Sequence, residues 1–411
     1  MLNRERMILR DLAKRLAEVA SLPVQAERRR CWTLHNDLKT TRPLVLVFPE
    51  GAWEELLPES ALCCESDAAR AIEGRLRQRL YYHDHLQDDT VVEKSWTIHT
   101  VMHSSGWGLE PKRIPSPERR GAWRFDPVIH EPADMKKLKF PEITVDERAT
   151  EQALDEAQEL FGDLLDVQLK GVAHISFHLM SLYTDLRGLE QVMMDMVLNP
   201  AWVHDAMAFL TAGHQRLIRQ YVDMNLLSLN NDDTYHSSGG NGYTEQLPAP
   251  GSDPIRVRPI DMWASAEAQE LAGVSPAMHN EFSTTYEKVL LAPFGLNGYG
   301  CCEALDAKLD DLLTIPNIRR VSIAPAADVD VCAERLRNTA IFSWKPNPAH
   351  LVGAFDEDRI RAYIRHTVEV AETHSCVLEM ILKDTHTCEH RPERFDRWVA
   401  LAREAIEEGI G

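Results

Sequence analysis

The chain is short of positive charge and has no long apolar run. Its 411 residues carry 64 acidic against 45 basic side chains, a formal net charge of −19. This excess of negative charge repels phosphate backbones and anionic lipids, which argues against nucleic acid or a membrane surface as a general partner. No stretch of about 18 apolar residues occurs, so we expect no membrane-spanning helix. The first six residues lead into a mixed-charge helix and lack the apolar core of a secretion signal.

A disulfide framework and phosphate-binding glycine motifs are also missing. Eight cysteines are sparse in a chain of this length, and no Cys-x-x-Cys pair occurs. A reducing cytoplasm is therefore the expected location. The longest polar loop, residues 230–244, contains glycines but no GK[ST] or GxGxxG pattern. We interpret it as a flexible active-site loop.

The chain does contain an alternation of apolar runs and helical patterns. Hydrophobic residues make up 44% of it and charged residues 27%, which is ordinary for a globular protein. Strand candidates cover residues 42–49, 91–101, 165–171, 226–229, 294–300, 320–324, 340–344 and 376–382. Helical patterns between most of them favour a (βα)8 TIM barrel over a doubly wound sheet. We therefore predict an α/β fold with a barrel over residues 41–411, long loop insertions, and an N-terminal helical extension over residues 1–40.

One stretch, residues 294–303, combines glycines, thiols and a carboxylate in the sequence FGLNGYGCCE. Gly298 and Gly300 allow backbone or ligand to approach closely. Cys301, Cys302 and Glu303 then bring soft and hard donors for a metal such as zinc. The alternative is that one thiol packs in the core and the other is incidental, because free cysteine is often buried.

A barrel places its active site at the carboxyl ends of its strands, so the polar residues that follow each strand candidate are the ones to weigh. They are Glu54, Glu55, His99, His174, Asp232, Asp233, Glu270, Cys301, Cys302, Glu303, Asp328, Lys345, Asn347, Lys383, Asp384, His386 and Cys388. The densest group is residues 383–388. We predict a metal site from Cys301, Cys302, His386 and Cys388, with zinc as the ion and Glu270 as an additional ligand. The alternatives are a local salt bridge for Lys383 and Asp384, and an incidental loop thiol for Cys388.

Several short motifs resemble the uroporphyrinogen decarboxylase superfamily, which includes cobalamin-dependent methyltransferases. The resemblance extends from about residue 42 to residue 406. Its motifs are Gly188-Leu189-Glu190 with Asn199-Pro200, Gly273-Val274-Ser275-Pro276, Tyr299-Gly300-Cys301-Cys302-Glu303, and Ser343-Trp344-Lys345-Pro346-Asn347-Pro348. The third motif stands where the zinc methyltransferases carry His-x-Cys-Gly, and residues 386–388 stand where they carry a second zinc cysteine.

The sequence departs from the family pattern at two places. Tyr299 or Gly300, depending on register, replaces the histidine of His-x-Cys, which leaves open which thiol is the ligand. The Arg-Gln-Ala-Gly-Arg motif, with which the decarboxylases grip substrate carboxylates, does not occur. The resemblance therefore favours the methyltransferase branch.

The resemblance implies a methyltransferase that moves a methyl group between a small substrate (an ether, amine or thiol) and the cobalt of a corrinoid. No Asp-x-His-x-x-Gly module occurs, so the corrinoid is expected on a partner protein. Roles as acids, bases or orienting groups are expected for Glu270, Glu303, Lys383, Asp384 and His386. The alternatives are a decarboxylase of a tetrapyrrole or other carboxylated substrate, and a non-catalytic binding subunit. A homodimer is the assembly to test.

Overall fold

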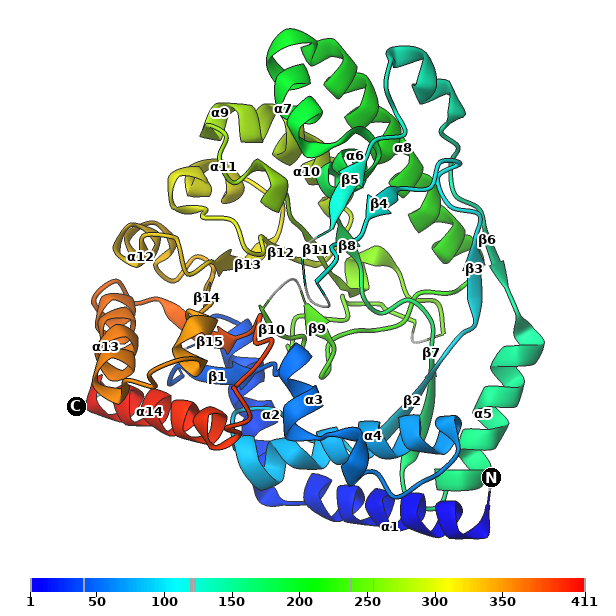
Figure 1. Cartoon of the computed structure of the whole chain (residues 1–411), viewed down its shortest axis with the longest axis vertical. Coiled ribbons are helices and arrows are strands. Elements are labelled where there is room, and N and C mark those ends of the chain that lie inside the picture. Colours follow the sequence, from blue (N-terminus) through cyan, green and yellow to red (C-terminus); the bar gives the residue numbers. More distant parts are fainter. Residues whose placement is uncertain are drawn as a thin grey trace.

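The computed structural model describes residues 2–39, 41–118, 121, 123–236, 239–253 and 255–409. Its central feature in these residues is a parallel sheet of seven strands (Figure 1). In spatial order the strands are β8 (Ser176–Phe177), β11 (Trp263–Ala266), β12 (Leu296–Tyr299), β13 (Ile318–Ile323), β14 (Ile341–Trp344), β15 (Val377–Leu382) and β1 (Leu44–Val47). All six neighbouring pairs are parallel, so the carboxyl ends of the strands lie along one edge.

Fourteen α-helices are found in the described residues, and most of them flank this sheet. They are α1 (Asn3–Ala20), α2 (Pro23–Asn36), α3 (Trp53–Leu56), α4 (Asp67–Tyr81), α5 (Glu147–Phe161), α6 (Leu179–Arg187), α7 (Leu189–Leu198), α8 (Pro200–Asp223), α9 (Pro276–His279), α10 (Thr285–Leu291), α11 (Leu309–Leu312), α12 (Val329–Leu336), α13 (Glu357–Thr373) and α14 (Glu393–Gly409). Ser275 accepts a hydrogen bond from the backbone N–H of Met278 and Pro276 begins α9, as helix-capping chemistry predicts. None of the described helices is long and apolar enough to cross a membrane.

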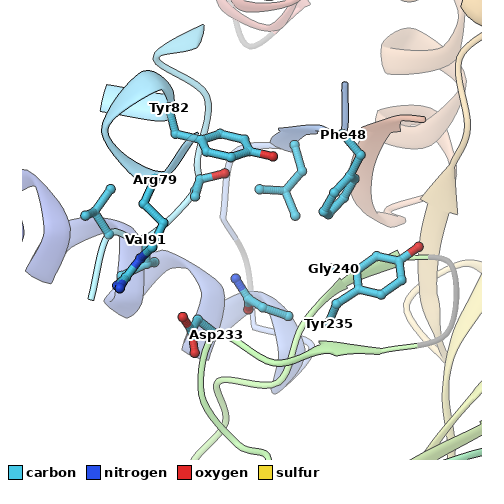
Figure 2. Close-up of a pocket in the computed structure, with 11 residues that line it drawn as sticks. Phe48, Arg79, Tyr82, Val91, Asp233, Tyr235 and Gly240 are labelled. Carbon is cyan, nitrogen blue, oxygen red and sulfur yellow. The ribbon is translucent and has the colours of Figure 1, made fainter. Parts of the chain in front are cut away.

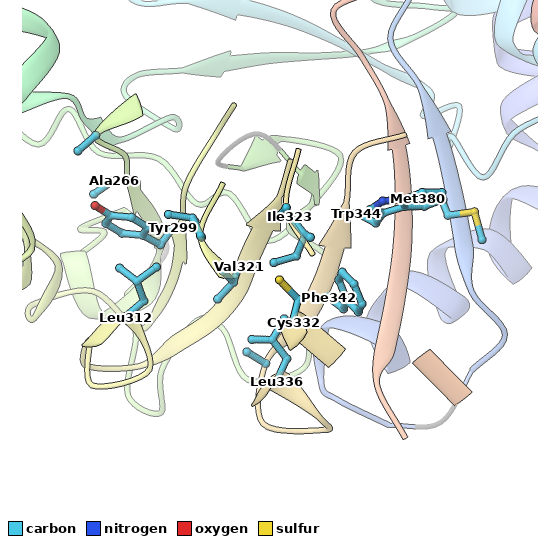
Figure 3. Packing of buried hydrophobic residues seen from close by; sticks show 14 of the residues in the cluster. Ala266, Tyr299, Leu312, Val321, Ile323, Cys332, Leu336, Phe342, Trp344 and Met380 are labelled. Carbon is cyan, nitrogen blue, oxygen red and sulfur yellow. The ribbon is translucent and has the colours of Figure 1, made fainter. Parts of the chain in front are cut away.

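The strands of the central sheet are buried on both faces. Figure 3 shows Val321, Ile323, Phe342 and Trp344 among the packed side chains of β13 and β14. Cys332 of α12 is part of the same cluster. Burial on both faces is typical of strands in a parallel sheet. Strand β13, Ile-Arg-Arg-Val-Ser-Ile, nonetheless carries the buried Arg320 and Ser322.

Four pairs of short strands lie outside the central sheet. They are β2 (Ser95–His99) with β7 (Asp166–Lys170), β3 (Met102–Ser104) with β6 (Ile143–Val145), β4 (Lys112–Ile114) with β5 (Arg124–Asp126), and β9 (Tyr235–His236) with β10 (Gly239–Asn241). The β2–β7 pair is parallel and packs with α1, α4 and α5 around a second, smaller core. The structure thus differs from the predicted barrel in where this pair lies.

The α/β class and the parallel sheet are confirmed, but in the described residues the sheet does not close into an eight-stranded barrel. Five of the eight strand candidates belong to the sheet. Residues 226–229 contribute only an isolated bridge, Leu227 to Val172. Strands β8 and β11 were not predicted, because one has two residues and the other, Trp-Ala-Ser-Ala, has no β-branched residue.

The open side of β1 is covered by two aspartates. The backbone N–H of Val45 donates to Asp89 Oδ2 at 2.8 Å, and that of Val47 donates to Asp88 Oδ2 at 2.9 Å. Asp89 is held in turn by Arg42 at 2.6 Å and Arg403 at 2.9 Å. These carboxylates satisfy donors that an eighth strand would otherwise bond.

A cluster of buried polar side chains lies at the centre of the fold, beneath the carboxyl ends of the strands. Glu379 of β15 accepts from Arg320 Nε at 2.9 Å and lies 3.1 Å from His35 Nε2. Asn36, at the end of α2, donates to the carbonyl of Asn241 at 2.9 Å. Helix α2 of the predicted N-terminal extension therefore reaches the interior of the sheet.

Candidate functional site

The adjacent thiols lie at the carboxyl edge of the sheet, directly after β12. Gly300 has φ +95°, and a Cβ there would lie 2.5 Å from Leu305 Cδ1. Only glycine fits this close, left-handed position, which turns the chain so that Cys301 and Cys302 follow the strand end. The Glu303 carboxylate fixes the turn by accepting from the backbone N–H of Cys301 at 2.9 Å.

The two thiols share one hydrogen bond. Cys301 Sγ and Cys302 Sγ are 3.5 Å apart and both are free thiols. The hydrogen bond with Cys302, together with burial, raises the pKa of Cys301. The same hydrogen bond lowers the pKa of Cys302. The pair therefore favours a single thiolate on Cys302, with the Cys301 proton directed at it.

Lys383 and Asp384, which follow β15, flank the thiol pair. Lys383 Nζ is 3.7 Å from Cys301 Sγ, and Cys302 Sγ is 3.7 Å from Asp384 Oδ2. Lys383 Nζ also lies 3.7 Å from Asp384 Oδ1. The structure thus brings together two predicted metal ligands, Cys301 and Cys302, and two predicted catalytic residues, Lys383 and Asp384, and all of these roles stay predictions.

A histidine and a glutamate that the sequence did not single out stand beside this group. His178 Nδ1 and Glu267 Oε1 are 2.8 Å apart. Burial opposes the charge on each, yet the hydrogen bond between them raises the pKa of His178 and lowers that of Glu267. They follow β8 and β11, the two strands that pattern analysis missed. Recognising β11 would have put Glu267 among the strand-end residues.

Glu270 and Glu303 are carboxyls whose surroundings favour the protonated form. Burial raises the pKa of both, and nearby Glu267 adds to the effect. Glu270 Oε2 is buried and has no hydrogen-bond partner among the described residues. A protonated carboxyl at this position is chemically suited to give a proton to a leaving group.

Lys345, at the end of β14, is a buried amine. Its Nζ donates to the carbonyl of Ser343 at 2.8 Å and to Ser343 Oγ at 2.7 Å. Burial lowers the pKa of Lys345 to about 7. A lysine in this state is divided between the neutral and the charged form near neutral pH.

Two predicted ligands of the metal site have other surroundings. Cys388 is buried, and its Sγ donates to Glu55 Oε2 at 3.2 Å. Glu55 also accepts from the backbone N–H groups of Cys388 at 3.0 Å and His390 at 2.9 Å. His386 packs against Gly51, where a Cβ would lie 3.2 Å from His386 Cα. The structure therefore gives Cys388 a loop-fixing role with Glu55 and does not bring it to the thiol pair.

The residues present do not fit a zinc ion as they are arranged. Cysteine and aspartate are donors that zinc accepts. Across the described residues, however, no three His, Cys, Asp or Glu side chains converge as a ligand set. The Lys383 ammonium, 3.7 Å from Cys301 Sγ, also helps to lower the pKa of Cys302, as the charge of a metal ion would. We therefore derive no chemical step through zinc.

A cavity of about 190 Å³ lies between the end of β1, α4 and the β9–β10 pair (Figure 2). Its walls include Phe48, Arg79, Tyr82, Asp233 and Tyr235. Tyr235 lines the cavity and also lies near the thiol site. Its pKa is raised by burial first, and then by nearby charges that include those of Cys301 and Asp384. Tyr235 thus links this partly open cavity to the surroundings of the thiol pair.

Comparison with known proteins gives similarities of fold among solved structures. No protein-family model matches the chain. No curated protein matches it either. Among solved structures, the chain is similar to a methyltransferase from Methanosarcina mazei, with 11% sequence identity and a TM-score of 0.48 over 93% of this chain and 99% of that one. Similarity at this level assigns neither a family nor an activity to the chain.

Proposed function

We propose that the chain is the methyltransferase component of a corrinoid-dependent system. It would move a methyl group between a small substrate and the cobalt of a corrinoid carried by a separate protein. The observation that carries the proposal is the reduced thiol pair, 3.5 Å between sulfurs and 3.7 Å from an ammonium, at the carboxyl edge of a parallel sheet. A stabilised thiolate is a soft nucleophile suited to a methyl carbon. The motif resemblance to the uroporphyrinogen decarboxylase superfamily supports the same reaction class.

Residues of the chain would have three roles: binding the substrate, reacting with the methyl group and transferring a proton. The cavity beside Tyr235 would hold the substrate and exclude water. The Cys302 thiolate would displace the heteroatom from the methyl carbon and become a methyl thioether, and it would be restored when the methyl group passes on to the corrinoid of the partner. Glu270 would supply or take the proton of the departing heteroatom. A corrinoid, when its carrier protein docks, supplies a cobalt centre that accepts and donates methyl groups.

The cavity volume weighs against the tetrapyrrole decarboxylase alternative. An apolar cavity of about 150 Å³ in a protein interior holds a molecule the size of benzene. The present cavity, at about 190 Å³, has room for one slightly larger. A tetrapyrrole, with four such rings, does not fit this space.

A methyl-transfer assay with reduced free cobalamin as a surrogate for the corrinoid protein tests the proposal. The purified chain is mixed with reduced cobalamin and a panel of methyl ethers, methylamines and methyl thioethers, and the cobalt absorbance is followed. We expect turnover that Cys302→Ala reduces at least about tenfold, as for loss of a nucleophile. Cys63→Ala removes an exposed thiol from the chain's other adjacent pair and is the matched control. Turnover unaffected by Cys302→Ala, or no turnover with any donor, would contradict the proposal.

Metal analysis of protein purified without chelators tests the zinc prediction separately. Near-stoichiometric zinc that is lost in Cys301→Ala or Cys302→Ala would show that the pair rearranges to bind it. Absence of zinc from active protein would leave the thiolate and Lys383 as the working parts of the site.

A further inference from the structure

The cavity of Figure 2 has one wall in common with the thiol site. Phe48 follows β1, and its backbone N–H donates to the carbonyl of Leu382 at 2.8 Å. Thr385 Oγ1 donates to the carbonyl of Phe48 at 2.7 Å. The segment that carries Lys383 and Asp384 is therefore bonded directly to the cavity wall.

The cavity is lined by one cation and one anion. Arg79 is held in place because its guanidinium donates to the carbonyls of Ser95 at 2.6 Å and Glu93 at 2.5 Å. A guanidinium has five N–H donors, so three of them remain. Among the described residues, no hydrogen bond or ion pair engages the carboxylate of Asp233. A cavity with both charges is complementary to a molecule that carries both charges.

A second polar atom lacks a partner at the same place. Asn241 is 6% exposed and lines the cavity, and its Oδ1 is buried without a hydrogen bond in the described residues. Leaving such an acceptor unpaired costs free energy, which a donor on a bound molecule or an ordered water would recover.

Aromatic rings form the opposite side of the cavity. In Figure 2, Phe48 and Tyr235 lie across the cavity from Arg79 and Asp233, with Tyr82 between the two sides. The rings of Phe48 and Tyr235 meet edge to face, 5.0 Å between centroids. Aromatic faces attract cations, above all methylated ammonium groups, whose charge is spread over their C–H bonds.

We propose that this cavity binds a small N-methylated amino acid, in which an ammonium carrying methyl groups is joined to a carboxylate. The carboxylate would meet Arg79, the ammonium would lie between Asp233 and the rings, and the methyl groups would point towards Tyr235 and the thiols. A volume of about 190 Å³ suits roughly six to ten non-hydrogen atoms. The binding stands on the cavity alone, whereas its meaning as methyl donor rests on the proposed function.

Isothermal titration calorimetry of the whole chain with three probes tests the binding. Glycine betaine has both charges, 3,3-dimethylbutyrate is its carbon isostere without the positive charge, and choline keeps the cation but lacks the carboxylate. We expect glycine betaine to bind at least about tenfold more tightly than either of the other two, since each loses one charged contact. No binding of glycine betaine at millimolar concentration, or equal binding of 3,3-dimethylbutyrate, would overturn the proposal.

Two variants locate the site. Asp233→Asn is expected to weaken glycine betaine about tenfold and to leave 3,3-dimethylbutyrate within about twofold, because only the cation is affected. Asp223→Asn, an exposed position at the end of α8, is the matched control and should change neither. Tyr235→Phe should retain binding and Tyr235→Ala should lose it. Unchanged affinity in both Asp233→Asn and Tyr235→Ala would sink the assignment.

The binding and the proposed function can fail independently. If glycine betaine binds as expected but no methyl donor reacts, the cavity assignment holds and methyl transfer is wrong. If another donor is demethylated and glycine betaine does not bind, the methyl-transfer proposal holds and the cavity assignment is wrong.

Discussion

The hydrogen bond from the Cys301 thiol sets the reactivity of Cys302. Replacing Cys301 with alanine removes the donor 3.5 Å from Cys302 Sγ and leaves Lys383 and Asp384 in place. Because this hydrogen bond is the largest cause of the lowered pKa of Cys302, its loss should raise that pKa. The thiol pair is therefore open to test without knowledge of the substrate.

The expected shift follows from the strength of one hydrogen bond. A hydrogen bond to a charged group contributes about 1.5–3 kcal/mol, and S–H is a weak donor, so we take the lower end. About 1.4 kcal/mol corresponds to one pKa unit. At pH 7 the thiolate fraction of Cys302 would then fall about tenfold, but a more basic thiolate is also about threefold more nucleophilic. The net alkylation rate should fall about threefold.

The assay is the rate of alkylation of Cys302 by iodoacetamide between pH 5 and pH 10, followed on its peptide by mass spectrometry. The curves of the wild type and of Cys301→Ala should cross. The variant should be slower at neutral pH. It should be faster once Cys302 is fully ionised in both proteins. Cys63→Ala, which changes the distant thiol pair, should reproduce the wild-type curve. A midpoint for Cys302 that is unchanged or lower in Cys301→Ala would refute the reasoning.

Two further predictions concern stability. Gly240→Ala should lower the free energy of unfolding by about 1–3 kcal/mol in urea titrations, since its Cβ would lie 2.7 Å from Arg320 Nη2 and Glu379 Oε2 in the packed centre. Gly273→Ala, with open space around it, should stay within about 0.5 kcal/mol of the wild type, and equal values for the two variants would contradict the packing argument. Burial raises the pKa of Asp233 to about 6. The charges of Asp232 and Glu93 raise this pKa further, and those of Arg79 and Lys170 lower it. A raised carboxyl pKa favours the fold below the unfolded pKa of about 4, and this contribution is lost as pH rises through about 6. Asp233→Asn should therefore stabilise the chain by about 1 kcal/mol at pH 8 and not at pH 4, in thermal unfolding, after allowance for screening, because part of this residue stays in contact with solvent. A gain that is equal at both pH values would contradict the shift.

Much of the sheet could be predicted because buried parallel strands often appear in the sequence as short, mostly apolar runs. Residues 341–344 and 377–382 are mostly apolar, which is the pattern of a strand covered on both faces. Residues 318–323 fit this pattern less well, because they include two arginines and a serine. Residues 226–229 show the same pattern, yet they form only one bridge. A short apolar run predicts that a segment is buried, but it does not predict which strand the segment pairs with.

The site was predictable where it depends on strand ends and unpredictable where it depends on turns. Cys301, Cys302, Lys383 and Asp384 are the first or second residues past a strand or its turn, so the sheet itself brings them together. Cys388 lies farther along, beyond Asp384 with φ +59°, a left-handed residue that redirects the chain. Such a turn cannot be inferred from residue order alone.

The two aspartates along β1 also bear on how the protein behaves at high concentration. A strand edge with free N–H groups is a template onto which another molecule's strand can pair, and this is a common start of aggregation. Asp88 and Asp89 accept hydrogen bonds from the N–H groups of Val47 and Val45. Strand β1, at one edge of the sheet, therefore offers no vacant donors at those positions. An incoming strand would have to displace two buried carboxylates first, of which Asp89 is ion-paired with Arg42 and Arg403. Protection of the β1 edge thus comes from side chains and not from a closing strand.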